Sequence, residues 1–231
     1  MIRVQVGLVI LWLLMGLPVL AAPGDTYPET SRALQERYVD EVLAHRNYNA
    51  YAKRAMEEGY PNIAHLFRSL AMSEAVHGRN FHALLQELKI PIPDAHNGLA
   101  VSTTRKNLKH ASTVEAQEID KEYPAILKRV RPEGHKLAIQ SITWAWKAEQ
   151  QHRDLIIQIR KAASYFFGLL VGRIEGEPSR YYVCQICGST LTEIPAKQCP
   201  ICSNLVHLYK EVPGYPGPAP MKPDIWKDDD E

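Results

Sequence analysis

Several features that mark common protein classes are missing from this sequence. Lysine and arginine form no long basic block, and the formal net charge is +1. Because binding to a phosphate backbone needs clustered Lys and Arg, a nucleic-acid partner is not expected. The sequence also lacks a Gly-rich phosphate loop and a nucleophile elbow, so neither P-loop nucleotide binding nor α/β-hydrolase chemistry is expected.

Charge is missing from residues 4–24. One basic residue, Arg3, precedes this apolar run, and the next charged residue is Asp25. The run ends at the small residues "VLAA", a pattern typical of a secretory signal peptide at 1–22. Its length also suffices to span a bilayer, so an uncleaved anchor is the alternative and the only membrane association expected. We therefore expect an exported, periplasmic protein.

Cysteine is missing from most of the chain. The four cysteines form two C-x-x-C pairs with 11 residues between the pairs: Cys184, Cys187, Cys199 and Cys202. Two such pairs can place four thiolates tetrahedrally around one ion. Iron and zinc both accept four thiolates, so the spacing leaves the metal open. Two disulfides are the alternative in an exported protein.

The region from about 29 to 163 is typical of helices. Two stretches, 61–89 and 135–163, carry apolar side chains at alternating steps of four and three residues, which is a heptad seam. Each seam is interrupted by one Glu and one His. Four helices are expected, at about 29–58, 61–89, 104–130 and 135–163.

The two halves of this region are related. Segments 58–77 and 133–152 align without gaps at an offset of 75 residues, and Tyr48 and Tyr123 keep the same offset. Two duplicated helix pairs predict a four-helix bundle with one long crossover.

The polar positions of the two seams repeat a metal-binding pattern. Glu74 and His77 lie three residues apart, so their side chains leave one helix face one turn apart, and Glu149 with His152 repeats this spacing. One such pair is common on helices and would mean little alone. The other two helices add three carboxylates near the same depth: Glu41, Glu115 and Glu118.

Such a cluster requires positive charge. Five carboxylates and two imidazoles would face one another in the bundle core, where one unpaired charge costs several kcal/mol. The two seams carry no Lys or Arg that could neutralise them. Oxygen-rich ligation with one His per ion favours iron or manganese over structural zinc. The residues therefore predict a dinuclear metal centre.

Taken together, these residues resemble rubrerythrin, a ferritin-like diiron protein with a rubredoxin-like domain. The resemblance covers residues 29 to about 212 and includes the segments "EGYPNIA" and "EYP". A spacing is shared as well, since 17 positions separate Glu41 from Glu58 but 18 separate Glu115 from Glu133.

The resemblance implies roles for individual residues. The seven Glu and His side chains would hold two irons, with His77 binding one iron in the diferrous form and Glu118 replacing it in the diferric form. This exchange is chemically reasonable because the harder ferric ion prefers a carboxylate. Tyr48 and Tyr123 match tyrosines that hydrogen-bond ligand carboxylates, and ordinary bundle packing is the alternative.

The cysteine segment contributes to the resemblance. "YVCQICG" and "QCPIC" are similar to a rubredoxin-type knuckle pair, which favours iron as a one-electron relay. Ser189 stands where an aromatic residue is common, so different packing is expected around the site. A zinc ribbon remains the alternative.

The expected fold class is mainly α, a ferritin-like bundle followed by a small rubredoxin-like metal knuckle. The expected segments are a signal peptide or anchor at 1–22, the bundle at 29–163, a linker at 164–180, the rubredoxin-like domain at 181–212 and a Pro-rich acidic tail at 213–231. The short linker would keep the cysteine-bound iron too far from its own bundle. A head-to-tail homodimer is therefore the expected electron route.

The resemblance implies a peroxidase that reduces hydrogen peroxide to water. Two bundle irons would deliver the electrons, and the cysteine-bound iron would return them one at a time from an unidentified electron-donor protein. Two alternatives remain open. The first is a ferritin-like iron-storage or ferroxidase protein with the same ligands, and the second is a bundle that carries a structural zinc ribbon.

Overall fold

The computed structural model describes residues 26–95, 100–165 and 180–214. The expected signal peptide lies outside these residues, as do most of the expected linker and tail. Within the described part of the chain, no helix is both long enough and apolar enough to cross a membrane.

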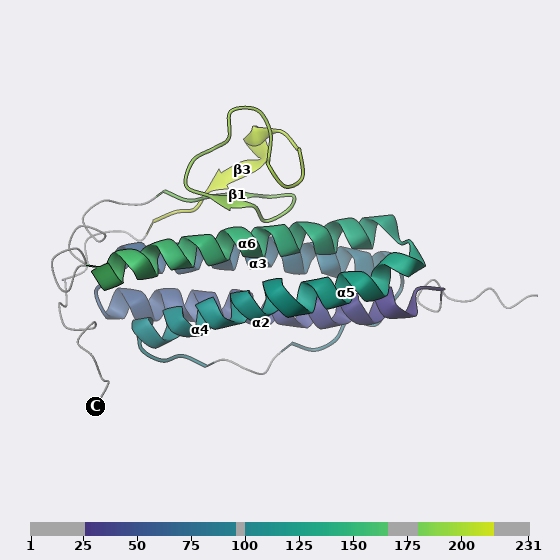
Figure 1. Cartoon of the computed structure of the whole chain (residues 1–231), viewed down its shortest axis with the longest axis horizontal. Helices are drawn as coiled ribbons and strands as arrows, with labels where there is room; N and C mark the ends of the chain where they lie inside the picture. Colours follow the sequence, from purple (N-terminus) through teal and green to yellow (C-terminus); the bar gives the residue numbers. More distant parts are fainter. Residues whose placement is uncertain (1–25, 96–99, 166–179, 215–231) are drawn as a thin grey trace, which may run out of the picture.

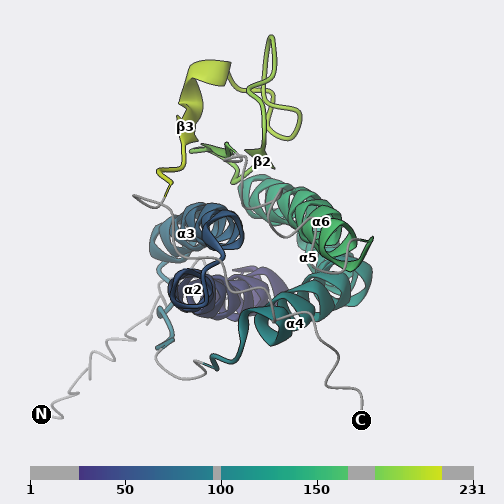
Figure 2. The ribbon, with the colours of Figure 1, turned by 90° about the vertical axis from the view of Figure 1, so that its left-hand side faces the viewer.

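The long helices form a four-helix bundle, as the duplicated seams predict (Figure 1). Three of its helices are α2 (Pro28–Glu57), α3 (Pro61–Glu87) and α6 (Lys136–Tyr165). The remaining bundle helix, third along the chain, consists of α4 (Thr104–Gln117) and α5 (Tyr123–Val130). A short turn joins α2 to α3, and a long crossover leads from α3 to α4 (Figures 1 and 2). The expected fold class is confirmed.

The third bundle helix differs from the expectation of one continuous helix over 104–130. A π-helix, η1 (Glu118–Glu122), separates α4 from α5. A π turn absorbs one extra residue in a helix and is frequent at functional sites. The second half has its extra residue between Glu115 and Tyr123, the segment that holds this π turn. With this extra residue, the side chains of Glu115 and Tyr123 are both buried in the bundle.

The glutamates of the two "EG" segments hold helix ends across the bundle. Glu133 accepts hydrogen bonds from the backbone N–H groups of Glu29 and Thr30 at the start of α2, both at 2.7 Å. Glu58 accepts one from the N–H of Thr104 at the start of α4, at 2.9 Å. The first N–H groups of a helix lack internal partners and attract negative charge. Each half therefore anchors the first helix of the other.

The apolar core consists of two clusters separated by a polar layer. One cluster surrounds Phe67, and the other surrounds Phe81 further along α3. Glu74 and His77 lie between these two positions and are both buried, at 2 % exposure. The apolar ends thus shield the polar layer from water.

A small C-terminal module packs against α3 and α6 (Figures 1 and 2). Its three short antiparallel strands are β1 (Tyr182–Cys184), β2 (Thr190–Leu191) and β3 (Tyr209–Glu211), in the order β2-β1-β3. Tyr182 pairs with Leu191 on one side and with Glu211 on the other. The sheet places both cysteine pairs at the side of the bundle.

Candidate metal centre

Six of the seven expected bundle ligands meet in two groups at the middle of the bundle. Within each group the potential ligand atoms lie within 4.8 Å of one another. The first group contains Glu41, Glu74, His77 and Glu149, and the second contains Glu74, Glu115, Glu149 and His152. Glu74 and Glu149 belong to both groups, so these two carboxylates are placed to bridge a pair of ions.

The orientation of His77 suits a metal ligand. Its Nε2 lies 3.2 Å from the carbonyl oxygen of Cys187, so Nε2 carries the hydrogen and donates it. Its Nδ1 faces three carboxylates, those of Glu41, Glu74 and Glu149, at 3.0 to 3.4 Å. A ligand histidine usually donates its second ring N–H to a carbonyl or carboxylate, which fixes the ring.

His152 repeats this arrangement. Its Nε2 lies 3.3 Å from the hydroxyl of Thr190, which donates its own hydrogen to the carbonyl of Gly188. Nε2 is therefore the donor, and Nδ1 faces Glu149 at 2.8 Å and Glu74 at 3.3 Å. Both histidines are thus held in orientation by groups of the C-terminal module.

The two expected tyrosines bond carboxylates across the bundle. Tyr48 on α2 donates to Glu115 on α4 at 2.6 Å. Tyr123 on α5 donates to Glu41 on α2 at 2.7 Å. These reciprocal bonds fix one oxygen of each carboxylate and leave the other oxygen for an ion.

The electrostatics of the layer also fit a bound cation. Burial raises the pKa of Glu41 to about 8 and raises the pKa of Glu115 well above its usual range. Despite burial, the neighbouring His152 and His77 hold the pKa of Glu149 well below its usual range. Within the described residues, Glu115 Oε2 is a buried atom without a hydrogen-bond partner. Such an atom is costly unless an ion binds it.

Glu118, the seventh expected ligand, stands apart from both groups. Its carboxylate lies 3.4 Å from the guanidinium of Arg37. Arg37 is 4 % exposed and also pairs with Asp40 and, at 2.9 Å, with Glu122. Sequence reasoning missed this arginine because it considered only the two seams. Its position one turn before Glu41 on α2 is the signal that could have revealed it.

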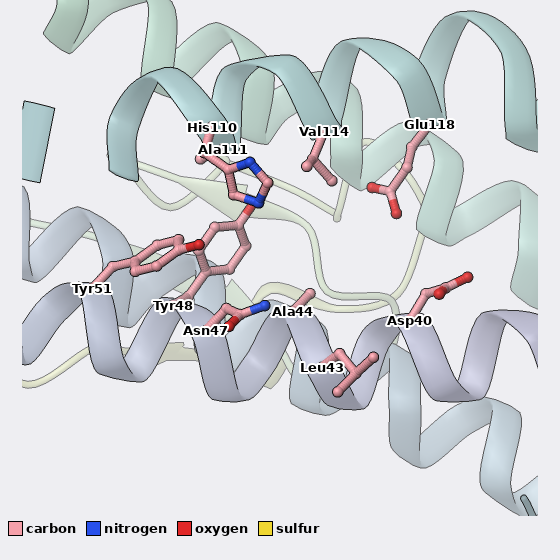
Figure 3. Close-up of a pocket in the computed structure, with 10 residues that line it drawn as sticks. All are labelled: Asp40, Leu43, Ala44, Asn47, Tyr48, Tyr51, His110, Ala111, Val114 and Glu118. Carbon is pink, nitrogen blue, oxygen red and sulfur yellow. The ribbon is translucent and has the colours of Figure 1, made fainter. Parts of the chain in front are cut away.

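A cavity of about 160 Å³ opens beside the polar layer, between α2 and α4. Figure 3 shows Glu118 and Asp40 at one end of this cavity and His110 with the two tyrosines Tyr48 and Tyr51 at the other. Since Tyr48 bonds Glu115, the wall of the cavity is in direct contact with the carboxylate cluster.

A second cavity, of about 300 Å³, reaches the layer between α2 and α3. Glu41 and Glu74 line it, together with the exposed Ala75. The carboxylate cluster is therefore bordered by cavities at two different helix pairs.

The four cysteines converge as their spacing predicts. The Sγ atoms of Cys184 and Cys202 are 3.8 Å apart, and those of Cys187 and Cys199 are 3.5 Å apart. A disulfide needs about 2.05 Å, so these are free thiols. Metal–sulfur bonds of about 2.3 Å in a tetrahedron require sulfur atoms about 3.8 Å apart. The separations therefore match a four-thiolate metal site.

The expectation that the cysteine module lies too far from its own bundle is wrong for this structure. Ser73 on α3 donates to the carbonyl of Gly188 at 2.6 Å, and Asn80 donates to that of Ile186 at 2.8 Å. His77 bonds Cys187 directly, as described above. Backbone carbonyls of the knuckle thus accept hydrogen bonds from polar side chains of α3 in the same chain.

Comparisons with known proteins agree with this geometry. The Rubrerythrin family profile matches residues 33–158. Rubrerythrin-2 of Clostridium acetobutylicum is 30% identical over 174 residues, covering 75% of this chain and 91% of that protein. Nigerythrin of Nitratidesulfovibrio vulgaris is 29% identical over 181 residues, covering 75% of this chain and 81% of its own length.

Solved structures give the same result. A structure described as a mixed-valence state of nigerythrin superposes with a TM-score of 0.68 at 26% identity, covering 79% of this chain and 86% of that one. A Desulfovibrio desulfuricans bacterioferritin, at 18% identity, has a TM-score of 0.62 over 69% of this chain and 94% of its own, which shows the shared fold.

Members of this family are oxidoreductases with a diiron site in the bundle and one iron in the four-cysteine site, and both ligand sets are present here. On the profile match, the relatives and the paired metal groups, this chain belongs to the rubrerythrin family.

Proposed function

We propose that this protein is a peroxidase that reduces hydrogen peroxide to water in the bundle and receives its electrons through the four-cysteine iron. The observation that carries the proposal is the contact of His77 with both sites. Its Nδ1 faces the carboxylate cluster, and its Nε2 donates to the carbonyl of Cys187. Family members use peroxide and redox partners and form dimers, which supports this activity.

The reaction needs two electrons and two protons for each peroxide that becomes two waters. A bound diferrous pair supplies both electrons when it is present. Glu41, Glu74, His77, Glu115, Glu149 and His152 would hold the pair, with Glu74 and Glu149 shared between the ions. Glu118 would join through the exchange with His77 that the family resemblance implies.

The chain positions these groups before any substrate arrives. Tyr48 and Tyr123 each hold one carboxylate oxygen, so Glu115 and Glu41 keep their orientation. The apolar clusters close the layer toward both ends of the bundle, so water and substrate can approach it only from the side, where the two cavities lie. The cavity between α2 and α4, about 160 Å³, is large enough for a peroxide molecule and has Glu118 in its wall.

An iron held by Cys184, Cys187, Cys199 and Cys202 would supply electrons to this layer one at a time. The Cys187 carbonyl and the His77 ring connect the two metal sites by a single hydrogen bond of 3.2 Å. Reduction of one peroxide would require two such electrons, and this contact would be their path. The module contacts its own bundle, so we propose that the transfer occurs within one chain and that any homodimer contains two such units.

The activity is tested by metal analysis and an optical spectrum, followed by mixing the fully reduced protein with peroxide. We expect iron in both sites, the visible absorption of iron bound by thiolates, and consumption of one peroxide per bundle in a single turnover. Accumulation of many irons per chain would instead identify an iron-storage protein. A colourless, zinc-containing cysteine site would disprove the relay.

The relay is tested with Cys184→Ser. This variant should keep the single oxidation of the bundle by peroxide and lose steady turnover with a reductase. Equimolar mixing with Glu74→Ala chains separates the two electron routes. Transfer within one chain predicts no recovery of turnover, whereas a head-to-tail dimer would restore it in mixed dimers.

Export is a separate proposal that depends on the apolar segment 1–22. Cell fractionation and the mass of the mature protein test it, since signal cleavage would remove this segment. Retention of the full mass in the membrane fraction would identify an anchor instead. The electron donor would then have to be sought outside the cytoplasm.

A further inference from the structure

The side chain of Tyr209 lies between the four-cysteine site and the bundle. It begins β3 and is 7 % exposed. Its hydroxyl oxygen is 3.2 Å from Cys199 Sγ and 2.8 Å from Ser189 Oγ. Both distances are within hydrogen-bonding range, so two acceptors face one hydroxyl group.

The hydrogens of this network can be counted. Gln151 Oε1 accepts the backbone N–H of Thr190 at 3.0 Å, which fixes the orientation of the Gln151 amide. Ser189 Oγ lies 3.0 Å from the same oxygen, and an amide oxygen can only accept. Ser189 therefore donates its hydrogen to Gln151 and meets Tyr209 as an acceptor.

Tyr209 thus has one hydrogen and two acceptors that compete for it. A phenol hydroxyl can donate once. With a thiolate at Cys199, the Tyr209 hydrogen can bond either this sulfur or the Ser189 oxygen. The choice depends on which acceptor is stronger.

The oxidation state of the iron alters this balance. Four thiolates and a ferric ion carry a net charge of −1, and reduction by one electron makes it −2. The sulfur atoms become stronger acceptors, and hydrogen bonds to charged acceptors are roughly twice as strong as neutral ones. The neutral Ser189 oxygen does not change.

We propose that the Tyr209 hydroxyl is a redox-linked hydrogen-bond switch, bonding Ser189 when the cysteine-bound iron is ferric and Cys199 when it is ferrous. One electron enters the site and no proton leaves, because the O–H bond only rotates. The bond to Cys199 stabilises the reduced form and raises the reduction potential. The bond to Ser189 stabilises the oxidised form and limits that rise.

The switch also explains the unusual residue after the first knuckle. Ser189 occupies a position where an aromatic side chain is common, and phenylalanine or tryptophan there would offer the Tyr209 hydroxyl no oxygen acceptor. Its link to Gln151 attaches the network to α6, one residue before His152. The contribution of this switch to electron delivery rests on the proposed peroxidase function, whereas its effect on the reduction potential of the cysteine-bound iron does not.

The test is a potentiometric titration of the iron-loaded full chain, followed at the absorption of the thiolate-bound iron. Tyr209→Phe removes the stronger bond and should lower the reduction equilibrium constant about tenfold, which for one electron is about 59 mV. Ser189→Ala removes the competing acceptor and should raise the potential instead. Opposite signs would not arise from a general loosening of the module.

The double variant Tyr209→Phe/Ser189→Ala completes the cycle. Because Ser189 acts through Tyr209, it should have the potential of Tyr209→Phe alone. An equal Ser189→Ala shift with and without Tyr209 would overturn the switch, as would a lowered potential in Ser189→Ala alone. Tyr182→Phe, on the neighbouring strand β1, is the control and should leave the potential unchanged.

The readout separates this inference from the proposed function. If the potentials shift as expected but the reduced protein does not consume peroxide, the peroxidase proposal fails and the switch stands. If peroxide is reduced but the potentials of the two single variants shift in the same direction, the switch fails alone. Should Tyr209→Phe lose iron, Ser189→Ala still decides the matter by the sign of its shift.

Discussion

Replacing Gly188 with alanine tests the contact that connects the two metal sites. Gly188 has a φ of +78°, and a Cβ atom at this position would lie 2.2 Å from His77 Nε2 and 2.7 Å from Ser73 Oγ. Ordinary contacts begin at 3.4 Å, so the distance to His77 must grow by about 1.2 Å. The His77 ring has little room to retreat, because its other side faces the carboxylate cluster. The module must move instead.

This movement should break the hydrogen bond from His77 to Cys187, now 3.2 Å long. Left-handed backbone geometry adds about 1–2 kcal/mol of strain for an alanine. Where a reaction depends on positioning, a misplacement of about 1 Å can cost about 100-fold. We therefore expect Gly188→Ala to slow electron transfer from the cysteine-bound iron to the bundle by about 10- to 100-fold.

The assay mixes reduced protein with peroxide in a stopped-flow instrument. Oxidation of the bundle should occur at the wild-type rate, and the colour of the oxidised thiolate-bound iron should appear late. Gly134→Ala is the matched control, since its φ is +72° and its added Cβ would meet no atom within 4 Å. It carries the same strain without the collision. Wild-type colour development in Gly188→Ala would refute the His77 route.

Three further predictions concern the bundle. Glu133→Gln should lose about 0.5–1 kcal/mol of folding stability because it weakens the cap of α2, and Glu87→Gln, at the exposed C-terminal residue of α3, is the comparison. Burial opposes the shift, but hydrogen bonds from Thr30 and Glu29 lower the pKa of Glu133 below 4.5 in the folded protein. The stabilisation is therefore present above pH 4.5 and is lost as the pH falls through the folded pKa. Denaturation at several pH values measures the stability difference between wild type and variant, and a difference independent of pH would contradict the prediction. Val114→Phe should raise KM for peroxide severalfold if the cavity between α2 and α4 admits substrate, whereas Ala75→Phe should have this effect if the α2–α3 cavity does. Arg37→Gln should destabilise the iron-free bundle by about 1–2 kcal/mol, since it leaves Glu118 without its cation while the partly exposed Asp40 and Glu122 remain hydrated, and an unchanged denaturation midpoint would show that water solvates all three carboxylates.

Much of the centre could be predicted because helical periodicity is local. Residues three apart share a helix face in any bundle, so Glu74 with His77 and Glu149 with His152 had to point the same way. Duplication then implied that both pairs meet at one depth. The two C-x-x-C pairs likewise predicted a four-thiolate site, because each pair lies within one short turn, whereas the 3.8 Å and 3.5 Å sulfur separations join one pair to the other and depend on how the two turns meet.

Other features depend on contacts that sequence periodicity does not encode. Glu118 pairs with Arg37 and lies outside the two metal groups, although the sequence placed it among the ligands without a competitor. The one-residue excess in the second half was visible, but its form as a π turn at Glu118–Glu122 was not. Both depend on how α2 and the third helix pack side by side.

The sequence by itself determined the two metal sites, since their ligands lie at fixed helical or knuckle spacing. The tertiary structure alone decided how the sites communicate. The approach of Gly188 to His77, and the meeting of Tyr209, Ser189 and Gln151, join residues from separate elements. Such contacts depend on how a module docks against a bundle, and docking is set by surface complementarity that no short-range pattern in the chain records.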